Sequence, residues 1–140
     1  MAIKMTTSEL QAFLAEHFPH MTEDFVVESV AENQAVLRLG VSDKNLRAGG
    51  TVNGPTMFAL ADVAFYLALM AMIGPQALAV TTNCSIDFMR KPMAGKDLIG
   101  KATILKLGRV LAVGDVLIYS EGADKPVARA GLTYSIPPKA

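Results

Sequence analysis

The stretch PTMFALADVAFYLALMAMI, residues 55–73, decides the fold because it is almost wholly apolar along its whole length. A proline in its first turn and Gly74-Pro75 just past its end are typical start and stop signals of a helix. A helix that is apolar on all sides must be enclosed by protein or by lipid. The stretch is therefore either the buried core of a folded domain or a membrane span.

The carboxylate of Asp62, in the middle of this predicted helix, argues against a membrane span because an ionised side chain is costly in lipid. No basic flank lies close on either side, and strand-like segments follow at once. We therefore expect residues 55–73 to form a central helix wrapped by a sheet, with no membrane as a partner.

The segments on both sides of the central helix have the pattern of strands. Before it, FVVESVA (25–31) and QAVLRLG (34–40) are separated only by Glu32 and Asn33, which is a typical hairpin signal. After it, short turns join four apolar-rich runs, which predicts an antiparallel meander. These runs are residues 77–90, 97–107, 110–120 and 126–136.

Residues 1–24 predict an amino-terminal helix and a lead-in to the first strand. Thr6 with Glu9, and Ser8 with Gln11, each fit the pattern in which the side chains at a helix start cap the backbone reciprocally. With 140 residues, we expect one domain over residues 1–140.

Composition excludes several classes of protein. Apolar residues make up 51% of the chain and charged residues 19%, which excludes a disordered chain. Thirteen basic and thirteen acidic residues cancel, so no overall charge favours nucleic acid as a partner. The single cysteine, Cys84, forms no internal disulfide, and no metal-binding spacing is present. The first residues lack the pattern of a secretion signal, so we expect a cytoplasmic protein.

The charge is nevertheless uneven along the chain. Residues 1–70 carry a net charge of −4 and residues 71–140 carry +4, an excess that includes Arg90, Lys91 and Arg109. These side chains are either solvated strand edges and turns or the mouth of a site for an anionic, nucleotide-bearing ligand. Charge alone favours the first interpretation, since exposed charges are the norm.

Asp62 is the first candidate for chemistry. Its neighbours one helical turn away include Phe58, Phe65 and Tyr66. A carboxylate among such side chains is poorly hydrated, which makes it a stronger base or nucleophile. The alternative is a structural role as one half of a buried ion pair.

The loop GGTVNGP, residues 49–55, is the second candidate. Backbone N–H groups at a helix start, such as that of Gly54, can stabilise negative charge on a carbonyl oxygen. The alternative is that the glycines only shape a turn. His17, His20 and Cys84 lie in no recognisable catalytic pattern.

Three blocks of the chain together resemble a known family. They are GGTVNGPTMFALAD (49–62), VTTNCSIDFMRKPMAGKDL (80–98) and LGRVLAVGDVLIYSEGADKPVARAGLTYSI (107–136). They are similar to the hot-dog acyl-CoA thioesterases of the phenylacetate-pathway (PaaI-like) type. The resemblance implies an α+β hot-dog fold, in which a bent antiparallel sheet wraps one long central helix. It also implies a homodimer or a homotetramer (a dimer of dimers) with active sites between subunits.

Carried over by position, the resemblance implies that Asp62 is the catalytic carboxylate, acting as nucleophile or general base. It implies that the Gly54 N–H polarises the thioester carbonyl and that Thr81 places the water, with Asp62 of one chain facing Thr81 of another. Asn53 stands where most relatives have histidine, and Pro55 replaces a second glycine. A side-chain amide can orient a ligand or water but cannot shuttle a proton.

The predicted function is hydrolysis of an acyl-CoA thioester to the free acid and CoA, with CoA as part of the substrate and no metal or other cofactor. An apolar pocket for the acyl group is expected at Phe58, Phe65 and Tyr66. The nucleotide phosphates are expected at Arg90, Lys91 and Arg109.

Two alternatives remain open at this point. A non-catalytic acyl-CoA-binding or sensor module would keep the pocket without turnover, which the departures at Asn53 and Pro55 favour. A hydratase or dehydratase acting on acyl thioesters normally pairs a histidine with a carboxylate. Neither His17 nor His20 lies near the predicted helix of Asp62.

Overall fold

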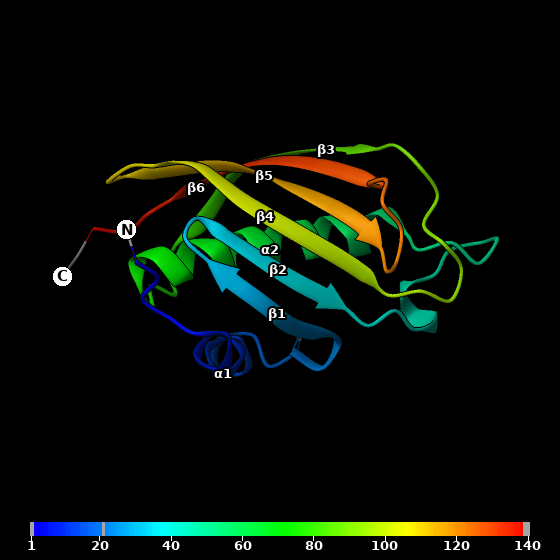
Figure 1. Cartoon of the computed structure of the whole chain (residues 1–140), viewed down its shortest axis with the longest axis horizontal. Coiled ribbons are helices and arrows are strands. Elements are labelled where there is room, and N and C mark those ends of the chain that lie inside the picture. Colours follow the sequence, from blue (N-terminus) through cyan, green and yellow to red (C-terminus); the bar gives the residue numbers. More distant parts are fainter. Residues whose placement is uncertain (1, 21, 139–140) are drawn as a thin grey trace.

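In the computed structural model, which describes residues 2–20 and 22–138, an antiparallel sheet of six strands curls around one long helix (Figure 1). The helices are α1 (Thr7–His17) and α2 (Gly54–Ile73), with short 3₁₀ helices at Thr22–Asp24 and Asp43–Asn45. The strands are β1 (Phe25–Ala31), β2 (Gln34–Leu39), β3 (Val80–Phe88), β4 (Leu98–Leu107), β5 (Leu111–Ser120) and β6 (Ala128–Ser135). The predicted α+β architecture is confirmed.

The central helix α2 begins one residue before the predicted start because Asn53 caps it. The Thr56 N–H donates a hydrogen bond of 2.8 Å to Oδ1 of Asn53. At the other end, Gly74 takes a positive φ of 87°, which a residue with a side chain rarely adopts. Helix α2 has the length and mean hydropathy of a membrane span, but 67% of its most apolar window is buried inside the protein. It is the core helix that the sequence predicts.

The strand order is β1-β2-β4-β5-β6-β3, which corrects the predicted meander. Strands β4, β5 and β6 follow one another as predicted, but β3 pairs with β6 and not with β4. The connection from β3 to β4 crosses the end of the β5–β6 pair, where the Met89 N–H donates to the Val127 carbonyl and the Met93 N–H to Oγ of Ser120. This connection is too long for a tight hairpin turn.

The two edges of the sheet differ. At β1, the side chain of Gln11 on α1 mimics a neighbouring strand: its Nε2 donates to the Phe25 carbonyl at 3.0 Å, and its Oε1 accepts from the Val27 N–H at 2.8 Å. Figure 1 shows α1 beside β1 and β3 at the opposite edge. On β3, Val80 is 55% exposed and Phe88 is 52% exposed.

Helix α2 lies unusually close to the sheet where the strands carry glycine. A Cβ atom at Gly114 would lie 2.5 Å from the ring of Phe65 on α2, and still closer to the Thr103 carbonyl. At Gly100 it would lie 3.1 Å from Leu60. Glycine at these positions therefore lets the concave face of the sheet accept the large side chains of α2.

Candidate active site

Two hydroxyl groups from neighbouring strands hold the side chain of Asp62. Oγ1 of Thr81 on β3 donates to Oδ1 of Asp62 at 2.6 Å, and the hydroxyl of Tyr134 on β6 donates to the same oxygen at 2.7 Å. Thr81 and Tyr134 are direct partners in the β3–β6 register, so both side chains lie on the face that covers α2. The pairing of β3 with β6 therefore builds this cluster.

The Asp62 cluster opens onto a cavity of about 300 Å³. Asp62, Thr81 and Tyr134 form its polar wall. The rest of the lining is apolar or aromatic and comes from α1, α2 and the start of β3: Leu14, Phe18, Val63, Tyr66, Ala79 and Val80. A carboxylate thus faces a space suited to a hydrocarbon group.

Within residues 2–20 and 22–138, Asp62 takes part in no ion pair, which disfavours the alternative of a buried structural pair. Burial raises the pKa of Tyr134, and the charge of Asp62 raises it further, so this hydroxyl stays protonated and remains a donor. Burial also raises the pKa of Tyr66, to about 12. Burial and the charge of Asp62 raise the pKa of the Cys84 thiol, which keeps it protonated and a poor nucleophile.

Gly54 lies away from Asp62 in the same chain. Asp62 is the eighth residue after Gly54 on α2, which corresponds to about 12 Å along the helix axis. The Gly54 N–H at the start of α2 has no hydrogen-bond acceptor within the described part of the chain, and Gly54 lines a different cavity of about 510 Å³. One thioester carbonyl cannot touch Asp62 and the Gly54 N–H of the same chain.

Asn53 and Thr81 differ from the roles that the sequence suggests. Oδ1 of Asn53 is engaged in capping α2, so this side chain has a structural role at the helix start. The prediction that Thr81 reaches Asp62 from a second chain is wrong, because the hydrogen bond forms within one chain. The sheet order explains this difference: pairing of β3 with β6 brings Thr81 back over the middle of its own helix.

Of the three aromatic candidates for the acyl pocket, only Tyr66 lines the cavity at Asp62. Phe65 has no exposed surface and packs on the ring of Tyr134, with ring centroids 5.5 Å apart. Phe58 is 39% exposed and lies outside this lining. Helical spacing alone does not show that Phe65 faces Gly114 on the sheet.

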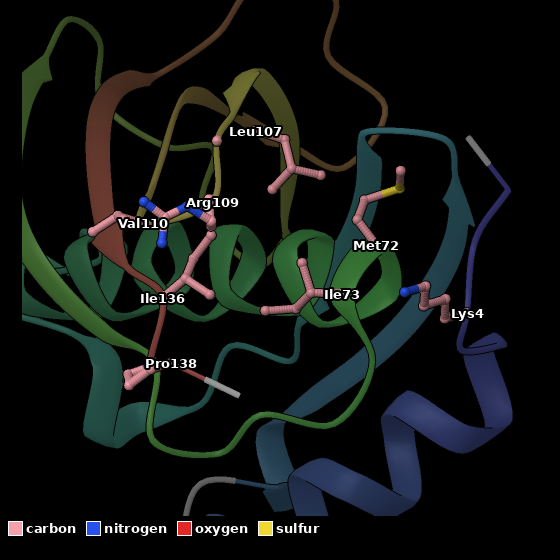
Figure 2. A pocket seen from close by; sticks show the side chains of 9 residues that line it. Lys4, Met72, Ile73, Leu107, Arg109, Val110, Ile136 and Pro138 are labelled. Carbon is pink, nitrogen blue, oxygen red and sulfur yellow. The ribbon is translucent and has the colours of Figure 1, made fainter. Parts of the chain in front are cut away.

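The basic candidates lie at opposite ends of α2. Arg90 and Lys91 line the cavity at Gly54, at the start of the helix. Arg109, on the turn between β4 and β5, lines a cavity of about 690 Å³ at the other end, together with Ile73 and Lys4 (Figure 2). The 20 residues of α2 span about 30 Å, so these cations form no single cluster in one chain.

Six residues that line the site are not predicted from the sequence: Leu14, Phe18, Val63, Ala79, Val80 and Tyr134. Leu14 and Phe18 have the spacing of an ordinary amphipathic helix, and Tyr134 alternates with the buried Leu132 like any core residue of a strand. The sequence signal that could have placed Tyr134 at a polar site is its hydroxyl group, because the oxygen of a buried tyrosine requires a hydrogen-bond partner. In the described ranges, no group of three or more His, Cys, Asp or Glu side chains could hold a metal ion.

Residues 49–127 match the model of the Thioesterase superfamily, so the chain belongs to this family. Among curated proteins, acyl-coenzyme A thioesterase PaaI of Escherichia coli (strain K12) is 33% identical over 94 residues. This match covers 66% of the present chain and 64% of PaaI, which is just under two thirds of that relative's length.

Two solved structures extend the match to most of the chain. A protein of Silicibacter sp. TM1040 described as a putative thioesterase is 53% identical with a TM-score of 0.91, covering 97% of this chain and 94% of its own. A mutant of the phenylacetic acid degradation protein PaaI from Thermus thermophilus is 33% identical with a TM-score of 0.74, covering 85% and 99%. The predicted hot-dog fold and the resemblance to PaaI-like thioesterases are confirmed.

Proposed function

We propose that the protein hydrolyses an acyl-CoA thioester to the free acid and CoA, with Asp62 as the catalytic carboxylate. The observation that carries this proposal is the Asp62 cluster. Its carboxylate has no cationic partner among the described residues, accepts hydrogen bonds from two hydroxyl groups, and lies at the wall of an apolar cavity. The relative named acyl-coenzyme A thioesterase PaaI supports the same type of reaction.

Two routes use Asp62 with the same overall result. As a general base, its carboxylate takes a proton from water, the water oxygen bonds to the carbonyl carbon, the C–S bond breaks, and the proton passes to the leaving sulfur. As a nucleophile, it bonds to the carbonyl carbon and expels the thiolate, and water then hydrolyses the mixed anhydride. Neither route requires a metal or a redox cofactor. The acyl group lies between Phe18 and Tyr66.

The working site needs a second copy of the chain, which supplies the Gly54 N–H. Strand β3 is an open sheet edge with exposed apolar side chains, and its unpaired backbone groups can bond another strand. If two copies of β3 pair antiparallel about a twofold axis, the Val80 end of one lies beside the Phe88 end of the other. The ring of Phe88 lies against Gly54, so this pairing brings the partner's Gly54 toward Asp62.

The same pairing gives the separated basic residues a common role. Arg90 and Lys91 lie near Gly54, whereas Arg109 lies near the Val80 end of the sheet, where Leu111, Ser135 and Val80 are aligned. Two copies would therefore bring the partner's Arg90 and the partner's Lys91 to the side of Arg109. Such a group of cations suits the phosphates of CoA.

The geometry disfavours a hydratase or dehydratase. Among the described residues, no histidine lines the cavity at Asp62: the ring of His17 packs at a tilt against Phe13, and His20 lines a separate cavity beside Asn53. The engaged side chain of Asn53 is the observation that favours a non-catalytic acyl-CoA-binding module. Binding of acyl-CoA without release of a thiol would identify that module.

The test is a panel of acyl-CoA thioesters assayed with a thiol reagent, using the wild-type protein and Asp62→Asn. This variant keeps the shape of the side chain and removes its charge. We expect kcat to fall by about 10²–10⁴, with substrate binding largely retained and melting temperature unchanged or raised. A folded Asp62→Asn protein with near-wild-type kcat would contradict the proposal.

A further inference from the structure

Both hydroxyl donors of the Asp62 cluster reach the same oxygen. Thr81 and Tyr134 donate to Oδ1 at 2.6 and 2.7 Å, while Oδ2 accepts no hydrogen bond in the described part of the chain. The two oxygens of the carboxylate are therefore not equivalent. Oδ1 is fixed by two neutral donors, and Oδ2 keeps all of its lone pairs for another partner.

Packing fixes the direction of the Tyr134 hydroxyl. The Tyr134 side chain is buried, and its ring centroid lies 5.5 Å from that of Phe65 and 5.9 Å from that of Tyr66. The hydroxyl carries one proton, and Oδ1 of Asp62 at 2.7 Å is a closer acceptor than the Asp62 main-chain carbonyl at 3.1 Å. The ring thus aims its proton at Oδ1.

We propose that Tyr134 is a positioning residue that, together with Thr81, fixes the Asp62 side chain so that Oδ2 is the oxygen presented to the substrate. This inference rests on the proposed function. It adds the oxygen that reacts, and it adds a residue outside the segment matched by the family model, which ends at residue 127. Without the Tyr134 donor, the carboxylate would turn more freely and its ionised form would lose one stabilising hydrogen bond.

Few other polar side chains lie beside this carboxylate. Among the described residues, the hydroxyl side chains that line the cavity with Asp62 are those of Thr81, Tyr134 and Tyr66, and the Tyr66 hydroxyl donates to the Ala77 carbonyl. Leu14 of α1 and Phe18, which follows α1, add only apolar groups to the lining. A fall in kcat with unchanged KM after removal of the Tyr134 hydroxyl therefore reports the lost hydrogen bond.

The experiment compares Tyr134→Phe with the control Tyr119→Phe in the same chain. Both variants keep an aromatic ring and lose one hydroxyl, but Tyr119 lies on β5, with Nζ of Lys101 4.7 Å from its ring centroid, and lines no part of the cavity at Asp62. For Tyr134→Phe we expect kcat to fall about 10- to 100-fold with KM unchanged, the size expected for one hydrogen bond to a charged group.

A second readout does not depend on turnover. The carbon-13 chemical shift of the Asp62 carboxyl, assigned with Asp62→Asn, should differ from the wild-type value in Tyr134→Phe and match it in Tyr119→Phe. An unchanged chemical shift in Tyr134→Phe, or an equal change in Tyr119→Phe, would overturn the inference. If the wild-type protein hydrolyses no thioester, the proposed function fails, while the chemical shift still decides whether Tyr134 holds the Asp62 carboxylate.

Discussion

The two edge strands of the sheet differ in whether another part of the chain covers them. At β1, α1 covers the edge, and both polar atoms of the Gln11 side chain bond the backbone as a neighbouring strand would. At β3, no helix of the described chain covers the edge, and Val80 and Phe88 stay exposed. The chain therefore completes one edge by itself and leaves open the edge that carries Thr81. The difference places the proposed catalytic site where a second copy can reach it.

The largest expected effect comes from breaking the open edge. Asn83→Glu combined with Ser85→Glu places like charges opposite one another when two copies of β3 pair, which is destabilising. We expect light scattering to give the mass of a monomer, and kcat/KM for acyl-CoA to fall about 100-fold or more because the partner's Gly54 is lost.

The matched control changes the covered edge. Val26 and Ser29 are exposed on β1, and Val26→Glu with Ser29→Glu should leave the mass and the activity unchanged. A monomeric β3 variant with full activity would contradict the shared site.

The next effect comes from uncovering the closed edge. Gln11→Ala removes the acceptor of the Val27 N–H and the donor to the Phe25 carbonyl. We expect the free energy of unfolding, measured by urea denaturation, to fall by about 1–3 kcal/mol, with the oligomeric state unchanged. Ser8→Ala, at an exposed position of the same helix, is the control. Equal losses in both variants would mean that Gln11 does not stabilise β1.

Phe18, the residue that follows α1, connects the closed edge to the site because its side chain lines the cavity. Phe18→Ala should enlarge the cavity and shift the ratio of kcat/KM for long against short acyl chains by roughly tenfold, about the worth of one or two methylene groups. The control is Phe58→Ala, which lies outside this lining. A similar shift in both variants would remove Phe18 from the determinants of acyl length.

The smallest effect tests whether phosphates bind across the open edge. If Arg90, Lys91 and Arg109 meet CoA phosphates, high salt should raise KM for acyl-CoA about threefold while kcat changes little. A short pantetheine thioester, which lacks the nucleotide, should be nearly insensitive to salt in the same assay. Equal salt dependence of both substrates would mean that these residues are solvated surface charges and do not bind the CoA phosphates.

Local signals predict most of the elements of the fold. The apolar run, Pro55 and Gly74 give α2 to within one residue, and Asn33, at a positive φ of 60°, makes the predicted hairpin turn. The place of β3 beyond β6 could not be predicted. It depends on which strands pair across long stretches of chain, and the alternation of apolar residues in β3 is the same beside either neighbour.

The same limit applies to the site. Asp62 can be identified from the sequence as a candidate site residue because a carboxylate within an apolar helix is unusual. Thr81 is also identified, but its origin from the same chain follows only from the strand order. The contact of Tyr134 with the site cannot be predicted from the sequence, since a tyrosine among apolar strand residues has the pattern of a core residue. Its contact with Asp62 spans 72 residues of sequence.

The position of β6 has a consequence for how the molecule is made. Strand β6 lies between β5 and β3, and it follows both of them in the sequence. During synthesis, β3 leaves the ribosome well before β6, its one partner strand within the described residues, and it cannot join the sheet until β6 is available. The newly made chain therefore carries β3, with the exposed side chains of Val80 and Phe88, unpaired until β6 folds. The hydroxyl cluster around Asp62 accordingly assembles only after β6 has joined the sheet.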